Sequence, residues 1–147
     1  MTPAQRAAVV AEAMTWLRTP FHHQARVKGD GVDCVNLLVA AYSGAGLLPS
    51  LALGEYARNW HFHQDEPRFL AEVQKYCDRV PEGETPQPGD IVMFSYGRHA
   101  SHGAIVTAWP QVIHAWAKVG KVVLSDVDSG PLAEALDSVW RLREVAP

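Results

Sequence analysis

A cysteine and two histidines have the residue types that nucleophilic catalysis requires. Cys34 follows Asp33 at the start of an apolar run, and His102 and His114 each accompany a short β-rich segment. A thiol attacks a carbonyl carbon when an imidazole takes its proton and a third polar group orients that imidazole. One histidine would face the thiol, and the other would fix its tautomer.

The position of Cys34 predicts how its thiol is activated. The run from Cys34 to Tyr42 favours a buried helix, with Asp33 as its N-cap and Gly44 or Gly46 at its end. Backbone N–H groups at a helix N-terminus favour negative charge, so we predict a lowered pKa for the Cys34 thiol. The alternative is that Cys34 is simply the first core residue of this helix, because free cysteines are among the most buried residues.

The two histidines are expected on neighbouring strands. His102 lies at the start of the segment 103–107, and His114 lies within 111–116. If Trp109-Pro110 forms the turn between these segments, the strands pair antiparallel and the imidazoles lie side by side. Taken singly, each histidine is better explained as a polar residue at a strand end. Together with Cys34, each occupies a position suited to one catalytic role.

A metal site is the other interpretation of the histidines. They include His22/His23, His61/His63 and the trio His99/His102/His114. The spacing lacks an H-E-x-x-H motif or paired C-x-x-C motifs, so zinc is only weakly indicated.

The second cysteine has a different context. Cys77 ends a helical pattern and is predicted to be a small core residue. The chain has no C-x-x-C spacing, and both cysteines are expected to be free thiols.

The elements that must position these residues divide the chain into two parts. The sequence predicts helices over residues 2–17, 33–42 and 66–77, and irregular segments over 20–33, 47–65 and 81–89. Short β-rich runs separated by turn residues follow, which predicts an antiparallel meander. They are residues 91–94, 104–106, 112–113, 122–124 and, as a last strand, 138–143. Helices first and strands later give an α+β fold with segregated layers.

Length and charge exclude several classes of protein. The 147 residues fit one domain, 1–147, and the net charge of −3 argues against nucleic acid as a partner. No stretch approaches the roughly 18 apolar residues of a membrane span. The N-terminus lacks the basic and apolar regions of a secretory signal, so we expect a protein made in the cytoplasm, with no membrane partner.

Five segments stand in a specific order along the chain, namely Trp16–Phe21, Gly31–Leu37, Pro88–Phe94, Ser101–Val106 and Val112–Ala115. In this order and at this spacing they resemble the NlpC family of bacterial cell-wall endopeptidases. The resemblance is greatest to the short phage-encoded branch that is associated with tails and gene-transfer particles. No single segment is decisive, but five in register are specific.

The resemblance implies a papain-like α+β fold in which the cysteine helix packs on an antiparallel sheet. It assigns Cys34 as the nucleophile, His102 as general base and later acid, and His114 as the orienting residue. The family typically hydrolyses amide bonds in peptidoglycan stem peptides, often between D-γ-glutamate and a diamino acid. It implies no metal and no organic cofactor.

One position departs from the family pattern. Many members carry a tyrosine after the Thr-Pro pair, where its hydroxyl helps to bind the oxyanion, whereas this chain has Phe21. His22 or His23 is a candidate to replace that hydroxyl, although a solvated loop pair explains them equally well. Asp33, predicted as a cap, and Ser101, beside His102, complete the candidate substrate or oxyanion residues.

The resemblance leaves two functions open besides the first. The main hypothesis is a phage-type peptidase that reaches the periplasm or cell wall as part of a particle, with tail-tip or hub proteins as partners. The second is a tail-tip or hub component that keeps the fold without catalysis, which the Phe21 departure slightly favours. The third is a related papain-like amidase or acyltransferase.

Overall fold

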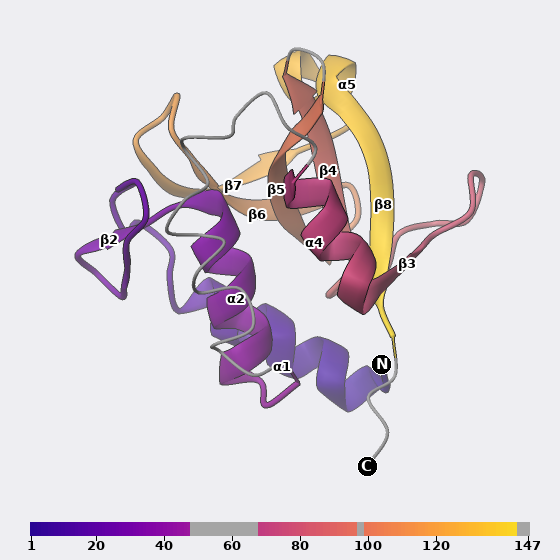
Figure 1. The fold of residues 1–147 in the computed structure, drawn as a ribbon, viewed down its shortest axis with the longest axis horizontal. Coiled ribbons are helices and arrows are strands. Elements are labelled where there is room, and N and C mark those ends of the chain that lie inside the picture. Colours follow the sequence, from indigo (N-terminus) through magenta and orange to yellow (C-terminus); the bar gives the residue numbers. More distant parts are fainter. Residues whose placement is uncertain (48–67, 97–98, 144–147) are drawn as a thin grey trace.

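The computed structural model describes residues 1–47, 68–96 and 99–143, which form helices packed on an antiparallel sheet (Figure 1). The predicted α+β fold, with N-terminal helices ahead of the sheet, is confirmed. The elements are α1 (Pro3–Met14), β1 (Arg26–Val27), β2 (Gly31–Val32), α2 (Cys34–Gly44), α4 (Arg68–Tyr76), β3 (Cys77–Arg79), β4 (Ile91–Tyr96), β5 (His99–Ala108), β6 (Gln111–Trp116), β7 (Lys121–Asp126), α5 (Gly130–Ala135) and β8 (Leu136–Leu142).

The main sheet has six strands in the order β3-β8-β4-β5-β6-β7, all paired antiparallel. Strands β4 to β7 form the predicted meander, and β8 returns to lie between β3 and β4. Trp109-Pro110 is the predicted turn, because Ala108 pairs with Gln111 across it. The sequence did not predict β3, which has three residues and follows directly on α4.

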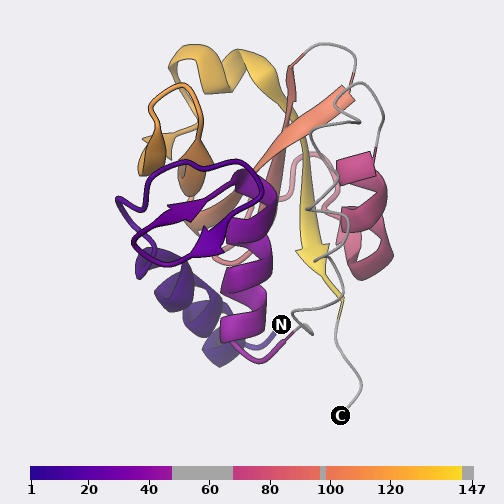
Figure 2. The same ribbon diagram turned by 60° about the vertical axis from the view of Figure 1, so that its left-hand side comes forward.

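The first two helices lie side by side in both views (Figures 1 and 2). Thr2 caps α1 in a reciprocal capping box with Gln5, and Pro3 opens the helix, as predicted. The helix ends at Met14, three residues before the expected Leu17, and turns follow it.

Two segments differ from the predicted pattern. Residues 20–33 were expected to be irregular, but they contain the hairpin of β1 and β2, whose strands have only two residues each and therefore show no period. A short helix, α5, precedes β8 and was not predicted. The expected irregular segment 47–65 and the start of the helix at Glu66 lie almost entirely outside the described residues.

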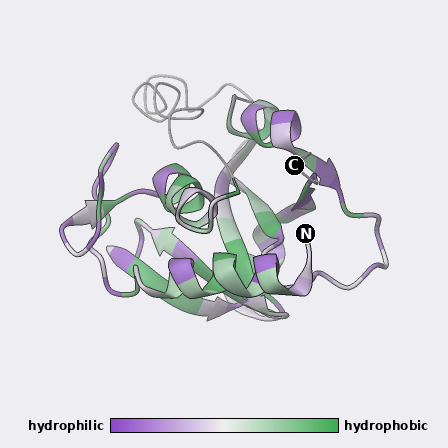
Figure 3. Cartoon of the chain, turned by 90° about the horizontal axis from the view of Figure 1, so that it is seen from below, coloured by the Kyte–Doolittle hydropathy of each residue, from purple (hydrophilic) through white to green (hydrophobic). Residues whose placement is uncertain are grey.

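The larger core lies between the helices and one face of the sheet. Val9 and Leu37 from α1 and α2 meet Ile105 and Ile113 from β5 and β6, all without exposed surface. Hydrophobic residues are concentrated in the middle of the molecule, and hydrophilic ones lie mostly at its periphery (Figure 3). A smaller cluster on the other face joins strand residues to Leu132 of α5.

A glycine lets helix α2 approach β5 closely. A Cβ atom on Gly103 would lie 2.9 Å from a Phe69 carbon and 3.2 Å from a Leu38 carbon. A side chain at this position would therefore have to displace the ends of the Phe69 and Leu38 side chains. Since Gly103 follows His102, the cysteine helix packs closely on the strand that carries this histidine.

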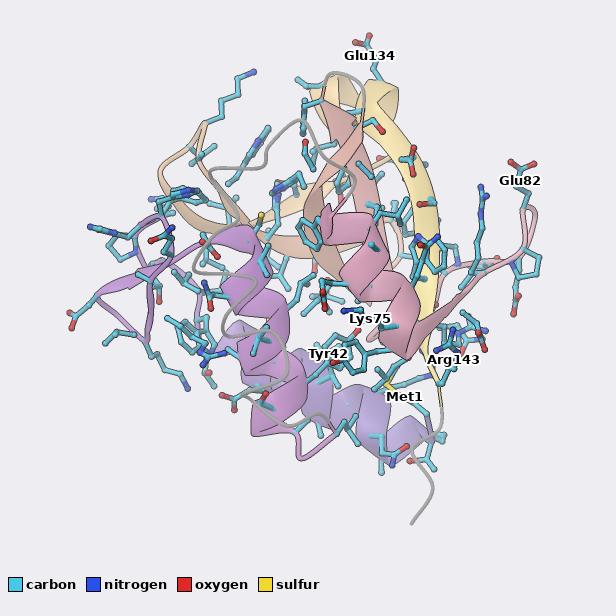
Figure 4. All side chains as sticks on the ribbon, in the orientation of Figure 1. Met1, Tyr42, Lys75, Glu82, Glu134 and Arg143 are labelled. Carbon is cyan, nitrogen blue, oxygen red and sulfur yellow. The ribbon has the colours of Figure 1, made fainter. Side chains whose placement is uncertain are left out.

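Polar contacts hold the opposite end of α2. The Tyr42 hydroxyl, which lies between α2 and α4 in Figure 4, donates a hydrogen bond to the Gly89 carbonyl. The neighbouring Asp90 carboxylate is fully buried and pairs with Arg6 at 3.0 Å and with Arg141 at 2.9 Å. Helices α1 and α2 are thus tied to β4 and β8.

Candidate active site

The start of α2 is fixed by a buried carboxylate. Asp33 accepts hydrogen bonds from the Asn36 backbone N–H at 2.9 Å and from the Asn36 side-chain amide at 2.9 Å. It also accepts one from the Gln24 backbone N–H at 2.7 Å. The predicted N-cap is therefore confirmed, and it makes Cys34 the first residue of the helix. The same carboxylate anchors the loop that carries Phe21 and His23.

The two histidines lie side by side, as predicted. Val106 pairs with Val112, and side chains alternate along each strand, so His102 and His114 project from the same sheet face. His102 Nε2 lies 2.7 Å from His114 Nδ1. His114 has no exposed surface and His102 is 7% exposed, so their hydrogen bond is shielded from solvent.

The structure brings Cys34 and His102 to one cleft. It has a volume of about 510 Å³ and is lined by Phe21, His23, Cys34, Tyr96, Ser101, His102, Trp116, Ala117, Lys118 and Pro131. The backbone N–H of Gly103 hydrogen-bonds the Cys34 sulfur, which places the sulfur directly beside the histidine strand.

Backbone hydrogen bonds tie the two walls of the cleft together. The Phe21 N–H donates to the Gly120 carbonyl at 2.8 Å, in the turn between β6 and β7. The His22 N–H donates to the Val32 carbonyl at 3.1 Å. The loop with Phe21 and the turn that follows Trp116 are therefore held in a fixed relation.

The sequence candidates for substrate or oxyanion binding divide into two groups. Phe21, His23 and Ser101 line the cleft. Asp33 is fully buried as the helix cap, His22 is exposed, and neither lines the cleft. Tyr96 and Lys118 also line the cleft, but the sequence does not mark them, because a tyrosine at a strand end and a lysine in a turn carry no motif.

The predicted lowering of the Cys34 pKa is wrong. Burial, and then the charge of Asp33, raise the pKa of the Cys34 thiol to about 12, although the N–H groups of Gly103, Val35 and Cys34 itself oppose the rise. The helix N-terminus does favour the thiolate, but the loss of solvation at a buried site outweighs it.

Burial also keeps the histidines neutral. It lowers the pKa of His102 to about 3, with a further contribution from His114, and that of His114 to about 4. Near pH 7 the site therefore holds a neutral thiol beside neutral imidazoles. The chemistry open to such a site is general-base catalysis, in which the proton leaves the thiol as the sulfur attacks.

Two further properties concern the part of the chain that the structure describes. Within it, no three His, Cys, Asp or Glu side chains are grouped so that they could hold a metal ion. None of its helices has the length and apolar character needed to cross a membrane.

Comparison with known proteins gives a match that spans most of the chain. The profile of the NlpC/P60 family matches residues 18–141. This range contains Cys34, both histidines and every residue that lines the cleft. Among curated proteins, none matches the chain significantly.

Solved structures share the fold. A lipoprotein-like NLP/P60 protein from Staphylococcus aureus superposes with a TM-score of 0.70 at 19% identity, over 99% of this chain and 43% of that one. RipB of Mycobacterium tuberculosis, a peptidoglycan hydrolase, superposes with a TM-score of 0.65 at 19% identity, over 99% of this chain and 70% of that one. The NlpC/P60 domain of the peptidoglycan hydrolase SagA superposes with a TM-score of 0.61 at 19% identity, over 93% of this chain and 98% of that one. This chain thus spans less than half of the S. aureus protein, and at these identities the likeness establishes the fold.

Proposed function

The chain belongs to the NlpC/P60 family, and on that premise we propose that it is a cysteine peptidase that hydrolyses amide bonds in peptidoglycan stem peptides. The observation that carries the proposal is the cleft that Cys34, at a helix N-terminus, shares with His102, which is hydrogen-bonded to His114. Nucleophile, base and orienting group are the three parts that this chemistry needs. SagA and RipB, which share the fold, are peptidoglycan hydrolases.

In the proposed reaction, the Cys34 sulfur attacks the amide carbon while its proton passes to the His102 imidazole. A carbon–sulfur bond forms, and the carbonyl oxygen becomes an oxyanion. The carbon–nitrogen bond then breaks as His102 returns the proton to the leaving amine, which leaves a thioester. Water, activated by His102, hydrolyses the thioester and releases the free thiol.

His23 is our candidate for the donor that Phe21 cannot provide. The Cys34 backbone N–H, at the start of α2, is one group able to bind the oxyanion. His23 lines the cleft near Phe21, and its ring nitrogens can donate a hydrogen bond. Loss of one such donor typically lowers the rate by about 10²–10³.

The charge of the cleft suits an acidic peptide. Lys118 lines it and carries a positive charge, whereas none of the described lining residues is an aspartate or glutamate. Stem peptides carry free carboxylates, which the charge of Lys118 attracts. We propose the D-γ-glutamyl–diamino acid bond as the bond cleaved, which is the bond that the motif resemblance implies.

We also propose that the protein acts at the cell wall as part of a phage-like particle, bound to tail-tip or hub proteins. The resemblance of its five motif segments to the phage-encoded branch supports this context. Immunodetection of the chain in particles purified from the source organism would test it, with particles from a gene deletion as control. Particles that lack the chain would contradict the proposal.

Digestion of purified sacculi tests the hydrolase. The wild-type protein and Cys34→Ala are incubated with sacculi that contain a diamino acid, and released muropeptides are identified by mass. We expect the wild type to release fragments cut after D-γ-glutamate and the variant to release none. Circular dichroism must show that the variant is folded.

The same experiment addresses the second candidate function, a non-enzymatic tail-tip component. The observation that favours it is Phe21, which lacks the family's hydroxyl donor. Equal release by both proteins, or no release by a folded wild type, would replace the peptidase with this structural role.

A further inference from the structure

A chain of hydrogen bonds runs through both histidines to a serine that no sequence motif marks. His102 Nε2 lies 2.7 Å from His114 Nδ1, and His114 Nε2 lies 2.9 Å from Ser125 Oγ. Ser125 belongs to β7 and pairs with Val112 of β6, so its side chain shares a sheet face with His114. Both nitrogens of His114 thus have protein partners.

Because His114 is buried, the hydrogen-bond partners of its two ring nitrogens matter for where its proton lies. His114 has no exposed surface, and the Trp116 ring covers it with its centroid 4.9 Å away. A buried N–H group that has no acceptor is costly, whereas a nitrogen lone pair left unpaired is tolerated more easily. The position of the single proton on His114 therefore depends on what lies at each end of the ring.

We propose that Ser125 is a positioning residue that accepts the His114 Nε2–H, and that it thereby leaves His102 Nδ1 free to act as the base. This inference rests on the proposed function, because it takes His102 to be the group that deprotonates Cys34. Ser125, on β7, would thus act on the reaction through the imidazole rings of His114 and His102.

The number of protons on the two imidazoles limits how the hydrogen bonds from His102 to Ser125 can be directed. A neutral imidazole has one N–H and one lone pair. If Ser125 accepts from His114 Nε2–H, then His114 Nδ1 accepts from His102 Nε2–H, and His102 Nδ1 keeps its lone pair. If the direction of these hydrogen bonds is reversed, His114 Nδ1–H donates to His102 Nε2. His102 then carries its proton on Nδ1, the only nitrogen left to face the thiol, and it is no base.

The catalytic step permits only the first of these two arrangements of protons, in which Ser125 accepts from His114 Nε2–H. When His102 has taken the thiol proton, both of its nitrogens carry hydrogen, so Nε2–H must donate to His114 Nδ1. His114 then holds its own proton on Nε2, where Ser125 Oγ is the acceptor at 2.9 Å. A side chain without an acceptor at position 125 would favour the reversed arrangement of protons, in which His102 is no base.

A matched pair of variants separates the hydroxyl from the shape of the side chain. Ser125→Thr keeps the hydroxyl, and Ser125→Val has the same branched shape without it; both residue types suit a strand. We expect Ser125→Val to lower kcat on a muropeptide by about 10- to 100-fold, the range for an unpaired buried donor, with KM little changed. Ser125→Thr and the exposed neighbour Leu124→Val should stay within about 3-fold of wild type.

Long-range proton–nitrogen NMR gives a readout that needs no substrate. In labelled wild type and Ser125→Thr near pH 7, the spectra of His102 and His114 should show Nε2–H tautomers. In Ser125→Val, both should shift toward Nδ1–H. Signals are assigned with His102→Gln and His114→Gln, and Ser125→Ala replaces the valine variant if that variant does not fold.

The two readouts distinguish the failure of this inference from the failure of the proposed function. Nδ1–H tautomers in the wild type, or unchanged tautomers in Ser125→Val, would overturn the role of Ser125 even if sacculi are digested. The predicted tautomers and their shift in Ser125→Val would support it even if no sacculus fragment is released. Equal loss of kcat in the threonine and valine variants would also overturn it.

Discussion

The two cysteines of this chain are alike by the usual measures and differ in what surrounds them. Cys34 is 5% exposed and Cys77 is 2% exposed, and burial raises the pKa of both thiols to about 12. Cys34 borders a cleft of about 510 Å³ that His102 also lines. Cys77 borders an apolar cavity of about 30 Å³, too small for a substrate.

The comparison shows that burial and thiol pKa do not separate a nucleophile from a core residue. Each sulfur is poorly solvated, so neither forms a thiolate on its own near pH 7. What distinguishes Cys34 is room for a substrate and a neutral imidazole that can take its proton. In the proposed mechanism, Cys34 is therefore activated by transfer of its proton to His102, and the pKa of the thiol alone does not determine its reactivity.

Alanine substitution at each cysteine in turn should give the largest difference between the two residues in turnover. Cys34→Ala removes the proposed nucleophile, and we expect kcat/KM on a soluble muropeptide to fall by at least about 10³-fold. Cys77→Ala changes only the core, and we expect kcat/KM within about 3-fold of wild type. Steady-state kinetics on both folded variants measures the contrast.

The outcome that would contradict this contrast is specific. If Cys77→Ala abolished turnover in a folded protein while Cys34→Ala retained it, the assignment of the nucleophile would be wrong. A comparable loss in both variants would show instead that the core around Cys77 holds the cleft in shape.

Alkylation should separate the two thiols by a smaller factor. In native protein, iodoacetamide reaches Cys34 through the cleft, whereas it reaches Cys77 only after local opening, so we expect Cys77 to react at least about 10²-fold more slowly. A raised pKa means that the thiolate fraction of Cys34 is small at pH 7 and keeps growing as the pH rises toward 12. The rate at Cys34 should therefore increase tenfold per pH unit from pH 7 to 9.

Mass spectrometry of peptides from timed samples gives both rates in one experiment. A plateau in the Cys34 rate below pH 8 would mean that a thiolate forms at rest, as the sequence predicted and the structure contradicts. Equal rates at the two cysteines would mean that the cleft gives Cys34 no special access.

The sequence predicted the parts of this site that local pattern determines. Asp33 as N-cap, Cys34 at the helix start and the turn at Trp109-Pro110 all follow from residue types next to one another. The pairing of His102 with His114 followed because a short turn dictates antiparallel neighbours.

The sequence could not predict what depends on distant parts of the chain. The sign of the Cys34 pKa shift was wrong because it depends on how deeply the folded protein buries the sulfur, which the helix position does not reveal. Ser125 was missed because its contact with His114 depends on the register of β6 with β7. Tyr96 reaches the cleft from the end of β4, and Lys118 from a turn.

Stability should show the smallest difference between the cysteines, and in the opposite direction. Cys77→Ala enlarges a small apolar cavity lined by residues such as Tyr42 and Phe69. It should lower the free energy of unfolding by about 1–2 kcal/mol, from lost apolar burial and the cavity left behind. Cys34→Ala opens its space to the cleft, where water can enter, so we expect a change within about 0.5 kcal/mol. Urea unfolding of both variants under identical conditions measures the two values. A larger loss for Cys34→Ala than for Cys77→Ala would mean that the active-site sulfur also stabilises the packing of α2 on β5, so that one residue would serve both the chemistry and the core.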